Sequence, residues 1–316
     1  MPEPFVGFAV GREYRLHEEM WPASPGFGRY IGGIQAKGRY PKTDGIVVLA
    51  EIEGGRYGNR WDGELLVYQG EDDKWASDPR NVNQALDKGN NRALASQRGG
   101  WPPVYLFSKA AGRANWRYEG LARVERVNVA RRAARDVVEF RILPLGIASI
   151  QDLSVMEDQI QVLDRQGPPR LTDESPSIAA GLRKARSASF PDRVKRNYED
   201  RCAVCGSHRL DAWGNVEVQA AHIFPREYNG ADNARNGLAL CTFHHWAFDG
   251  GLFFLTREFT IKPTSPGMAV PEIRDLDSKR LAFLPSDPRD RPHEVFIAAR
   301  GRIPRFADLL RNNRTG

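Results

Sequence analysis

Cys202-Ala-Val-Cys205 and Cys241-Thr-Phe-His244 are the stretches of sequence that decide the fold of the C-terminal half. In each pair two residues separate the ends, so a tight turn can direct both side chains at one ion. Three thiolates and one imidazole form the tetrahedral set that structural Zn²⁺ prefers, and His208 is a rival for the fourth place. The chain has 3 cysteines, all in this region. An odd number in a chain without a secretion signal argues against disulfides, so we predict a zinc site.

A second group of polar residues lies between and just after these pairs: His222, Asn236, His245 and Asp249. Hydrolysis of a phosphodiester needs an activated water and a cation beside a non-bridging oxygen. A neutral imidazole such as that of His222 can take a proton from water at about neutral pH. If their segment is helical, His245 and Asp249 share one face and can bind one divalent ion. The pattern therefore predicts metal-assisted hydrolysis.

The order of these residues, with the phrases Asn-Gly-Leu-Ala-Leu-Cys and His-His-Trp-Ala-Phe-Asp, resembles the HNH nucleases of the ββα-metal fold. The resemblance covers about residues 190–260. It implies that His222 is the general base and that His245 binds a catalytic Mg²⁺ or Mn²⁺. It also implies that Asn236 holds the loop between them and orients the base.

Two positions depart from the family pattern. Many HNH proteins have a second metal ligand directly before the base, where this chain has Ala221. Related versions have Glu three residues before the base, where this chain has Gln219. The two positions point the same way on a strand, so Gln219 or a water is expected to fill the role.

Residues 1–150 show the pattern of a β-rich domain. Apolar runs at 45–50 and 64–68 are typical of buried strands, and further strands are predicted at 116–127 and 136–143. Gly and Pro separate these runs. We predict a curved sheet or partly open barrel with flanking helices, within an α+β protein.

Two strings of the N-terminal half are more specific. They are Gly-Asn-Asn-Arg-Ala-Leu-Ala at 89–95 and Trp-Arg-Tyr-Glu-Gly at 116–120. Together with the stretches from Gly32 and Asp44, they resemble the SRA (YDG) domain over about residues 5–145. This resemblance implies that the domain binds 5-methylcytosine flipped out of duplex DNA.

The resemblance also implies a pocket, because a base can be examined on all sides only outside the stack. Tyr68 is expected to stack on the base, with Tyr57 as the second aromatic. Asn59 stands where the family has a cytosine-reading Asp, and its amide can accept from cytosine N4 and donate to N3. Asp62 is the alternative if the register shifts. Further expected pocket residues are Gln69, Gly54 and Gly55, and the expected DNA-contacting residues are Ile31, Gln35, Arg80 and Asn81.

The domain boundaries follow from composition and motifs. We predict a modified-cytosine-binding domain at 1–150, a linker at 151–188, an HNH domain at 189–262 and a tail at 263–316 that packs on the HNH domain. The linker prediction rests on Gln-Gly-Pro-Pro-Arg at 166–170 and Thr-Asp-Glu-Ser-Pro-Ser at 172–177. A helix is predicted from Pro191 to about Glu199, with Pro just inside its start.

Composition is consistent with a nucleic-acid partner. The net charge is +6, and 27% of the residues are charged. The apolar runs are all shorter than the ~18 residues that cross a bilayer, and the start of the chain does not resemble a signal peptide, so a cytoplasmic protein is expected.

The combined prediction is a restriction endonuclease that cuts DNA carrying 5-methylcytosine. Because one buried methyl is worth only ~0.8 kcal/mol, 5-hydroxymethylcytosine is a second candidate base. A single HNH site cuts one strand, so a double-strand break implies a dimer or two binding events, and a homodimer is the default expectation. Two alternatives are a methylated-DNA reader with an inactive HNH scaffold and an HNH nuclease with a different recognition module.

Overall fold

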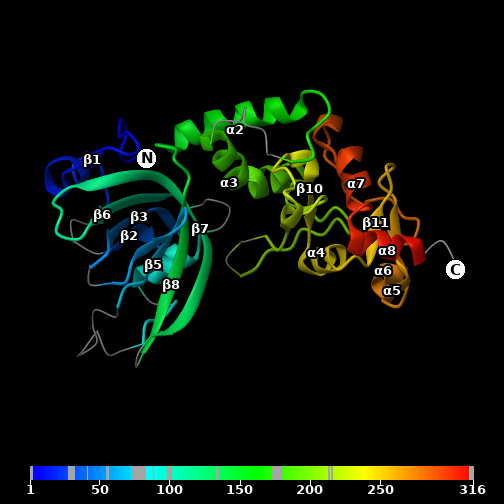
Figure 1. Ribbon diagram of the computed structural model, residues 1–316, viewed down its shortest axis with the longest axis horizontal. Helices are drawn as coiled ribbons and strands as arrows, with labels where there is room; N and C mark the ends of the chain where they lie inside the picture. The colour runs from blue at the N-terminus through cyan, green and yellow to red at the C-terminus, as the bar shows by residue number, and fades with distance from the viewer. Residues whose placement is uncertain are drawn as a thin grey trace. The chain divides into compact units, whose positions relative to one another are not determined.

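The chain folds into two compact units, Met1–Met156 and Glu157–Gly316 (Figure 1). The mixed α+β class predicted from the sequence is confirmed. No helix among the described residues is long and apolar enough to cross a bilayer. The computed structural model describes residues 3–27, 33–40, 42–54, 57–72, 83–87, 89–97, 102–132, 135–172, 180–212, 214 and 216–312.

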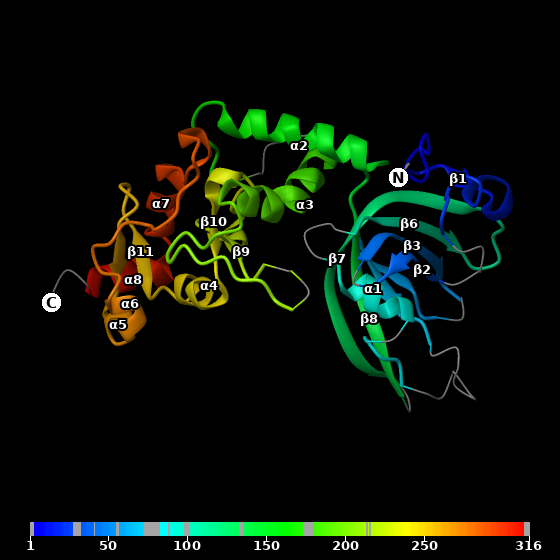
Figure 2. The ribbon, with the colours of Figure 1, turned by 180° about the vertical axis from the view of Figure 1, so that it is seen from behind.

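Unit 1 is built on one sheet with the strand order β2-β3-β6-β7-β8-β5-β4 and with β1 beside β7. β3 and β6 are parallel, and the other pairs of this sheet are antiparallel. Figures 1 and 2 show β7 and β8 as long, curved strands. All four strand predictions are confirmed. The strands are β1 (Glu13–Tyr14), β2 (Ile34–Arg39), β3 (Lys42–Ile52), β4 (Arg60–Asp62), β5 (Leu65–Gln69), β6 (Val104–Ala110), β7 (Trp116–Arg132) and β8 (Arg135–Pro144).

The apolar run in β3 lies at the centre of unit 1. Its residues from Ile46 to Ala50 are buried on both faces of the sheet, as a continuous apolar run predicts. The string at 89–95 forms the helix α1 (Gly89–Ala95), which places Ala93 and Leu94 in the same core. Asn91 ties α1 to the segment after β5, because its side chain accepts from Glu71 N at 2.7 Å and donates to Glu71 O at 2.9 Å. The string therefore has a structural role.

The Tyr-Glu-Gly string lies in β7, at an irregularity in its pairing with β6. Gly120 has φ +91°, and a Cβ there would lie 2.5 Å from the carbonyl oxygen of Ile147. Glycine is required here by both the backbone conformation and the close approach. The hydroxyl of Tyr118 donates to Ala148 O at 2.6 Å. This bond ties the segment that follows β8 to β7.

Unit 2 contains the ββα arrangement that the sequence predicted. β9 (Gln219–His222) and β10 (Gly237–Leu240) pair antiparallel, and α4 (Thr242–Asp249) begins directly after Cys241. The helix α2 (Ile150–Arg165) runs across the boundary between the two units. The other helices and strands of unit 2 are α3 (Ala180–Asn197), β11 (Phe253–Leu255), β12 (Ile261–Pro263), α5 (Ser265–Met268), α6 (Pro271–Arg274), α7 (Glu294–Arg300) and α8 (Pro304–Asn312).

The residues after 262 share one hydrophobic core with the ββα element. Phe296 of α7 and Phe306 of α8 are buried in the same cluster as Phe248 of α4. The ring of Phe306 meets that of Phe254 edge-on, with centroids 5.7 Å apart. This segment is therefore part of the body of unit 2.

Residues 151–188, which were predicted to form a linker, contain most of one helix and the beginning of another. α2 occupies 150–165, and α3 begins at Ala180, so the helix predicted from Pro191 starts earlier and contains that proline in its interior. The sequence signal was misleading because Pro and Gly residues cluster only at 166–170, between the two helices. Buried contacts of Asp164 and Arg193, described below, hold the ends of both helices to the ββα element.

Candidate active site

The metal-ligand group predicted from the Cys and His pairs is brought together by the fold. The ligand atoms of Cys202, Cys205, Cys241 and His244 all lie within 4.8 Å of one another. His244 Nδ1 is 3.1 Å from Cys241 Sγ and 3.5 Å from Cys202 Sγ. His208 is exposed and lies outside the group. The two turns therefore supply four ligands that can hold one metal ion.

Two of the three thiols of this group, those of Cys202 and Cys241, favour the protonated form. Burial raises the pKa of Cys202 to about 12, and it also raises the pKa of Cys241. A bound divalent metal replaces the thiol protons and converts such groups to thiolates outright. The three sulfurs and one imidazole nitrogen thus fit a metal that prefers soft ligands.

His222 ends β9, and its ring contacts Phe190 and Asp232. Its ring stacks on Phe190 with centroids 4.0 Å apart and an interplanar angle of 15°. Its Nε2 lies 2.9 Å from Oδ1 of Asp232, a carboxylate that is 3% exposed. Sequence reasoning missed Asp232, because it lies ten positions away in a loop and no periodic pattern links the two residues.

Asn236 is fully buried and closes the loop between β9 and β10. Its Oδ1 accepts from Phe224 N at 2.8 Å, and its Nδ2 donates to Phe224 O at 3.1 Å and to Ala231 O at 2.9 Å. Three bonds to the main chain fix the loop at both ends. Next to it, Gly237 must be glycine, since a Cβ there would lie 2.2 Å from Val194.

His245 lies on α4 with Asp249 one turn later. Nε2 of His245 is 3.3 Å from Oδ2 of Asp249, and Nδ1 is 2.8 Å from Oε1 of Gln219. Burial acts to raise the pKa of Asp249, but the hydrogen bond and charge of His245, with Arg300 and Arg305, lower it overall. The carboxylate is therefore ionised at neutral pH, and its side chain remains about half exposed. His245 is thus in contact with both Asp249 and Gln219.

Arg300 of α7 is a further buried residue that sequence reasoning missed. Its guanidinium lies 3.8 Å from the ring centroid of Phe248 and 4.1 Å from that of Phe306. It donates to Ile223 O at 3.0 Å and to Phe248 O. It thereby joins the residue after His222 to the end of α4. No sequence pattern pointed to Arg300, because it lies far along the chain from the segment that contains His222 and His245.

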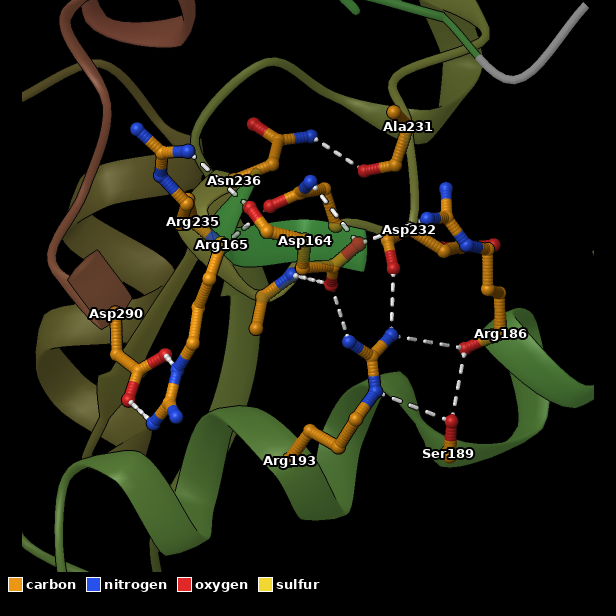
Figure 3. A network of polar contacts seen from close by, with 12 residues as sticks. Asp164, Arg165, Arg186, Ser189, Arg193, Ala231, Asp232, Arg235, Asn236 and Asp290 are labelled. Atoms are coloured by element: carbon orange, nitrogen blue, oxygen red, sulfur yellow. Dashed lines mark hydrogen bonds and ion pairs between the residues drawn. The ribbon is translucent and has the colours of Figure 1, made fainter. Parts of the chain in front are cut away.

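A polar network lies behind the loop that contains Asp232 and Asn236 (Figure 3). Asp164 at the end of α2 accepts from Ala234 N at 3.0 Å, and it pairs with Arg186 at 2.9 Å and with Arg193. Arg193 also donates to Asp232 O at 2.7 Å. Two buried charges on helices outside the ββα element thus fix the main chain of this loop.

Two of the residues predicted for a base pocket, Tyr68 and Asn59, are buried within unit 1. Tyr68 is 1% exposed and lies in the core of unit 1, where its hydroxyl abuts Gly33. The side chain of Asn59, 4% exposed, accepts from Gln69 N at 2.9 Å and donates to Glu51 O at 3.3 Å. In this conformation neither side chain is presented to a base.

The other predicted recognition residues lie nearer the surface or outside the described residues. Asp62 forms an exposed pair with Arg141 at 2.8 Å. Tyr57 and Gln69 are half-buried, and Gly54 has φ +95°. Gln35 is buried on β2. The remaining predicted residues, Gly55, Ile31, Arg80 and Asn81, lie outside the described part of the chain.

Comparison with known proteins identifies the C-terminal motif. Residues 202–256 match the family model described as HNH endonuclease, which confirms the resemblance predicted from the sequence. The match spans the metal-ligand group together with His222, Asn236 and His245. This segment of the chain is therefore similar to the HNH endonucleases. No curated protein matches the chain significantly.

Three solved structures illustrate the range of similar folds. The modification-dependent restriction endonuclease TagI is 21% identical, with 96% of this chain and 95% of that chain covered and a TM-score of 0.42. The SUVH5 SRA domain in complex with methylated CHH DNA is 20% identical over 45% of this chain and 92% of that chain, with a TM-score of 0.35. The type IV phosphorothioation-dependent restriction endonuclease ScoMcrA is 16% identical over 76% and 59% of the two chains, with a TM-score of 0.32.

Proposed function

We propose that this protein is a modification-dependent DNA endonuclease, in which unit 2 hydrolyses a phosphodiester bond and unit 1 reads a modified cytosine in duplex DNA. The observation that carries the proposal is the match of residues 202–256 to the HNH endonucleases, together with the fixed geometry of His222 and Asn236. The net charge of +6 favours a polyanionic partner.

In the proposed reaction His222 is the general base. It takes the proton of a water whose oxygen forms the new bond to phosphorus, while the bond from phosphorus to one ester oxygen breaks. Asn236 holds the loop that positions this base. His245 and Asp249, beside Gln219, would hold Mg²⁺ or Mn²⁺. A cation there supplies charge stabilisation at a non-bridging phosphate oxygen.

The group of Cys202, Cys205, Cys241 and His244 is proposed as a structural Zn²⁺ site. Three sulfurs and one nitrogen at mutual separations under 4.8 Å match the tetrahedral set of such sites. Cys202 and Cys241 are buried in the core of unit 2, so the metal would stabilise the fold around β9, β10 and α4.

Recognition of the modified base is assigned to unit 1. The similar SUVH5 SRA structure contains methylated DNA, and the similar TagI enzyme is modification-dependent. Both 5-methylcytosine and 5-hydroxymethylcytosine are candidate bases. Since Tyr68 and Asn59 are buried, reading by these residues requires the neighbouring segments to rearrange when DNA binds. A double-strand break takes either two HNH sites or two binding events, and we propose a homodimer on DNA.

A methylated-DNA reader with an inactive HNH scaffold is the second candidate. Ala221 occupies the position where many HNH proteins have a second metal ligand. In addition, Gln219 contacts one ring nitrogen of His245, and an amide oxygen is a weaker ligand than a carboxylate. These features favour weak binding of the catalytic metal.

Cleavage of one plasmid, with and without enzymatic cytosine methylation, tests the proposal in Mg²⁺ and in Mn²⁺. We expect cutting of the methylated form, abolished by His222→Ala and retained by His208→Ala, an exposed histidine of the same unit. Equal cutting of both plasmids would refute modified-base recognition and keep the nuclease. Methyl-selective binding without cutting in either metal would establish the reader instead.

A further inference from the structure

The contact between His222 and Asp232 is a feature of unit 2 that the HNH pattern does not explain. Nε2 of His222 lies 2.9 Å from Oδ1 of Asp232, and the carboxylate is 3% exposed. Burial strengthens such a charge-assisted hydrogen bond, because the local dielectric constant is low. Phe190 restrains the same ring from its face, with an interplanar angle of 15°. Stacking fixes the plane of the imidazole, and the hydrogen bond fixes its rotation within that plane.

Asp232 is itself held from two sides. Its Oδ2 pairs with Arg226, which begins the short helical turn η2 (Arg226–Tyr228). The side chain of Arg226 is 57% exposed. Its main-chain carbonyl accepts from Arg193 of α3 at 2.7 Å (Figure 3). Arg193 is in turn paired with Asp164 and bonded to Ser189 at 3.1 Å. The carboxylate is thus anchored through both its main chain and its side chain.

We propose that Asp232 is the positioning residue for the general base, an inference that rests on the proposed nuclease function. Its carboxylate accepts the Nε2–H of His222, so the neutral imidazole carries its lone pair on Nδ1. During hydrolysis the proton of the attacking water moves to Nδ1 as the oxygen–phosphorus bond forms. The ester oxygen that leaves phosphorus takes a proton from solvent. Asp232 stays ionised and stabilises the imidazolium.

A purely structural role is the alternative explanation. Asp232 lies in the loop that Asn236 closes, so its loss can loosen that loop without any effect specific to the base. The two explanations differ in one respect. A positioning residue acts through His222, so its effect on the rate disappears when His222 is removed, whereas effects of loop stability persist.

The test is a double-mutant cycle measured by single-turnover cleavage of a methylated duplex. We expect Asp232→Asn to lower the rate on the order of 10²-fold with DNA affinity unchanged. In a His222→Ala background the same substitution should change the residual rate by less than about 3-fold. Asp290→Asn is the matched control, because it also removes a buried carboxylate paired with an arginine, Arg165 at 2.5 Å, and it should cut at the wild-type rate.

A second measurement does not depend on cleavage. The tautomer of His222 can be read from long-range ¹H–¹⁵N correlation spectra of the full chain at about pH 8, with His222→Ala to assign it among the 6 histidines. We expect the Nε2–H form, converted partly or fully to Nδ1–H by Asp232→Asn, because an asparagine amide can donate to Nε2.

Each outcome decides one claim. A wild-type chain that cuts no DNA but holds His222 in the Nε2–H form would refute the proposed nuclease, and with it the role of His222 as a base, but would keep the orientation of its imidazole by Asp232. A cutting enzyme in which Asp232→Asn stays within about 3-fold of the wild-type rate would overturn the positioning role alone. So would an Nδ1–H tautomer in the wild type, or an equal loss of rate with and without His222.

Discussion

Replacement of Asp164 by alanine probes how firmly α2 and α3 hold the loop behind the active site. Asp164 ends α2 and is 3% exposed. Its carboxylate pairs with Arg193 and Arg186, and it accepts from Ala234 N at 3.0 Å and from Asn233 Nδ2 at 3.1 Å. The substitution removes all four contacts at once and adds no bulk.

The expected loss in the free energy of unfolding follows from Arg193, which stays buried without its charged partner. Arg193 is 2% exposed, and without Asp164 the acceptors that its guanidinium keeps among the described residues, such as Ser189 Oγ and Asp232 O, are neutral. Breaking a buried ion pair by removing one partner costs roughly 3–5 kcal/mol. The main-chain N–H of Ala234 also loses its acceptor. We therefore expect Asp164→Ala to lower the free energy of unfolding of this region by at least ~3 kcal/mol.

Hydrogen–deuterium exchange read by mass spectrometry measures this effect locally. Since 1.4 kcal/mol corresponds to a factor of ten, exchange protection of peptides covering 231–240 should fall by about 10²- to 10³-fold or more. Peptides from β7 and β8 of unit 1 should be unchanged and serve as the internal reference. Activity on methylated DNA should fall as well, because the same loop carries Asp232 and Asn236.

Asp277→Ala is the matched control. Asp277 forms an exposed pair with Lys262 at 3.5 Å, a type of contact worth about 0–1 kcal/mol. The reasoning is refuted if Asp164→Ala changes protection of 231–240 no more than Asp277→Ala does. That result would mean that Arg193 and Arg186 find other partners or admit water at little cost.

Two further predictions concern the metal group and unit 1. Cys241→Ser should reduce bound zinc from about one per chain to a small fraction, as measured by metal analysis, and should lower the thermal stability of unit 2, as measured by calorimetry. A variant that keeps its full zinc content would contradict the assignment of four ligands. Gly120→Ala should destabilise unit 1 by more than the roughly 1–3 kcal/mol of a positive φ alone, because the new Cβ would lie 2.5 Å from Ile147 O. Gly112→Ala, at φ +77° with nothing within 4 Å, should show only the backbone cost, and equal losses in melting temperature would argue against the close contact.

Local signals predicted much of the fold. The two-residue spacing of the Cys and His pairs is a property of single turns, so it identified Cys202, Cys205, Cys241 and His244 before their distances were known. Alternating or continuous apolar runs likewise located β3, β5, β7 and β8. The four-residue spacing of His245 and Asp249 predicted a pair on one helical face, and α4 provides it.

Local signals failed where tertiary contacts decide. Pro191 and the Pro-Gly cluster at 166–170 indicated a linker and a short helix, yet α3 extends from Ala180 through that proline. The apolar run at 64–68 indicated a buried strand, whereas the family resemblance placed Tyr68 in a base pocket, and the structure encloses its ring in the core of unit 1. Resemblance to a family predicts which residue type stands at a position, but burial depends on every segment packed around it.

The sequence by itself determined the HNH segment, the metal-ligand group and the β-rich N-terminal half, because turns, strands and single helices are specified by neighbouring residues. Only the tertiary structure paired Asp232 with His222, placed Arg300 against Phe248, and joined Asp164 to Arg193. These contacts connect residues in loops and separate helices, where no period or spacing encodes proximity. Their partners are selected by the packing of the whole unit, which brings buried charges together because burying them apart would cost far more.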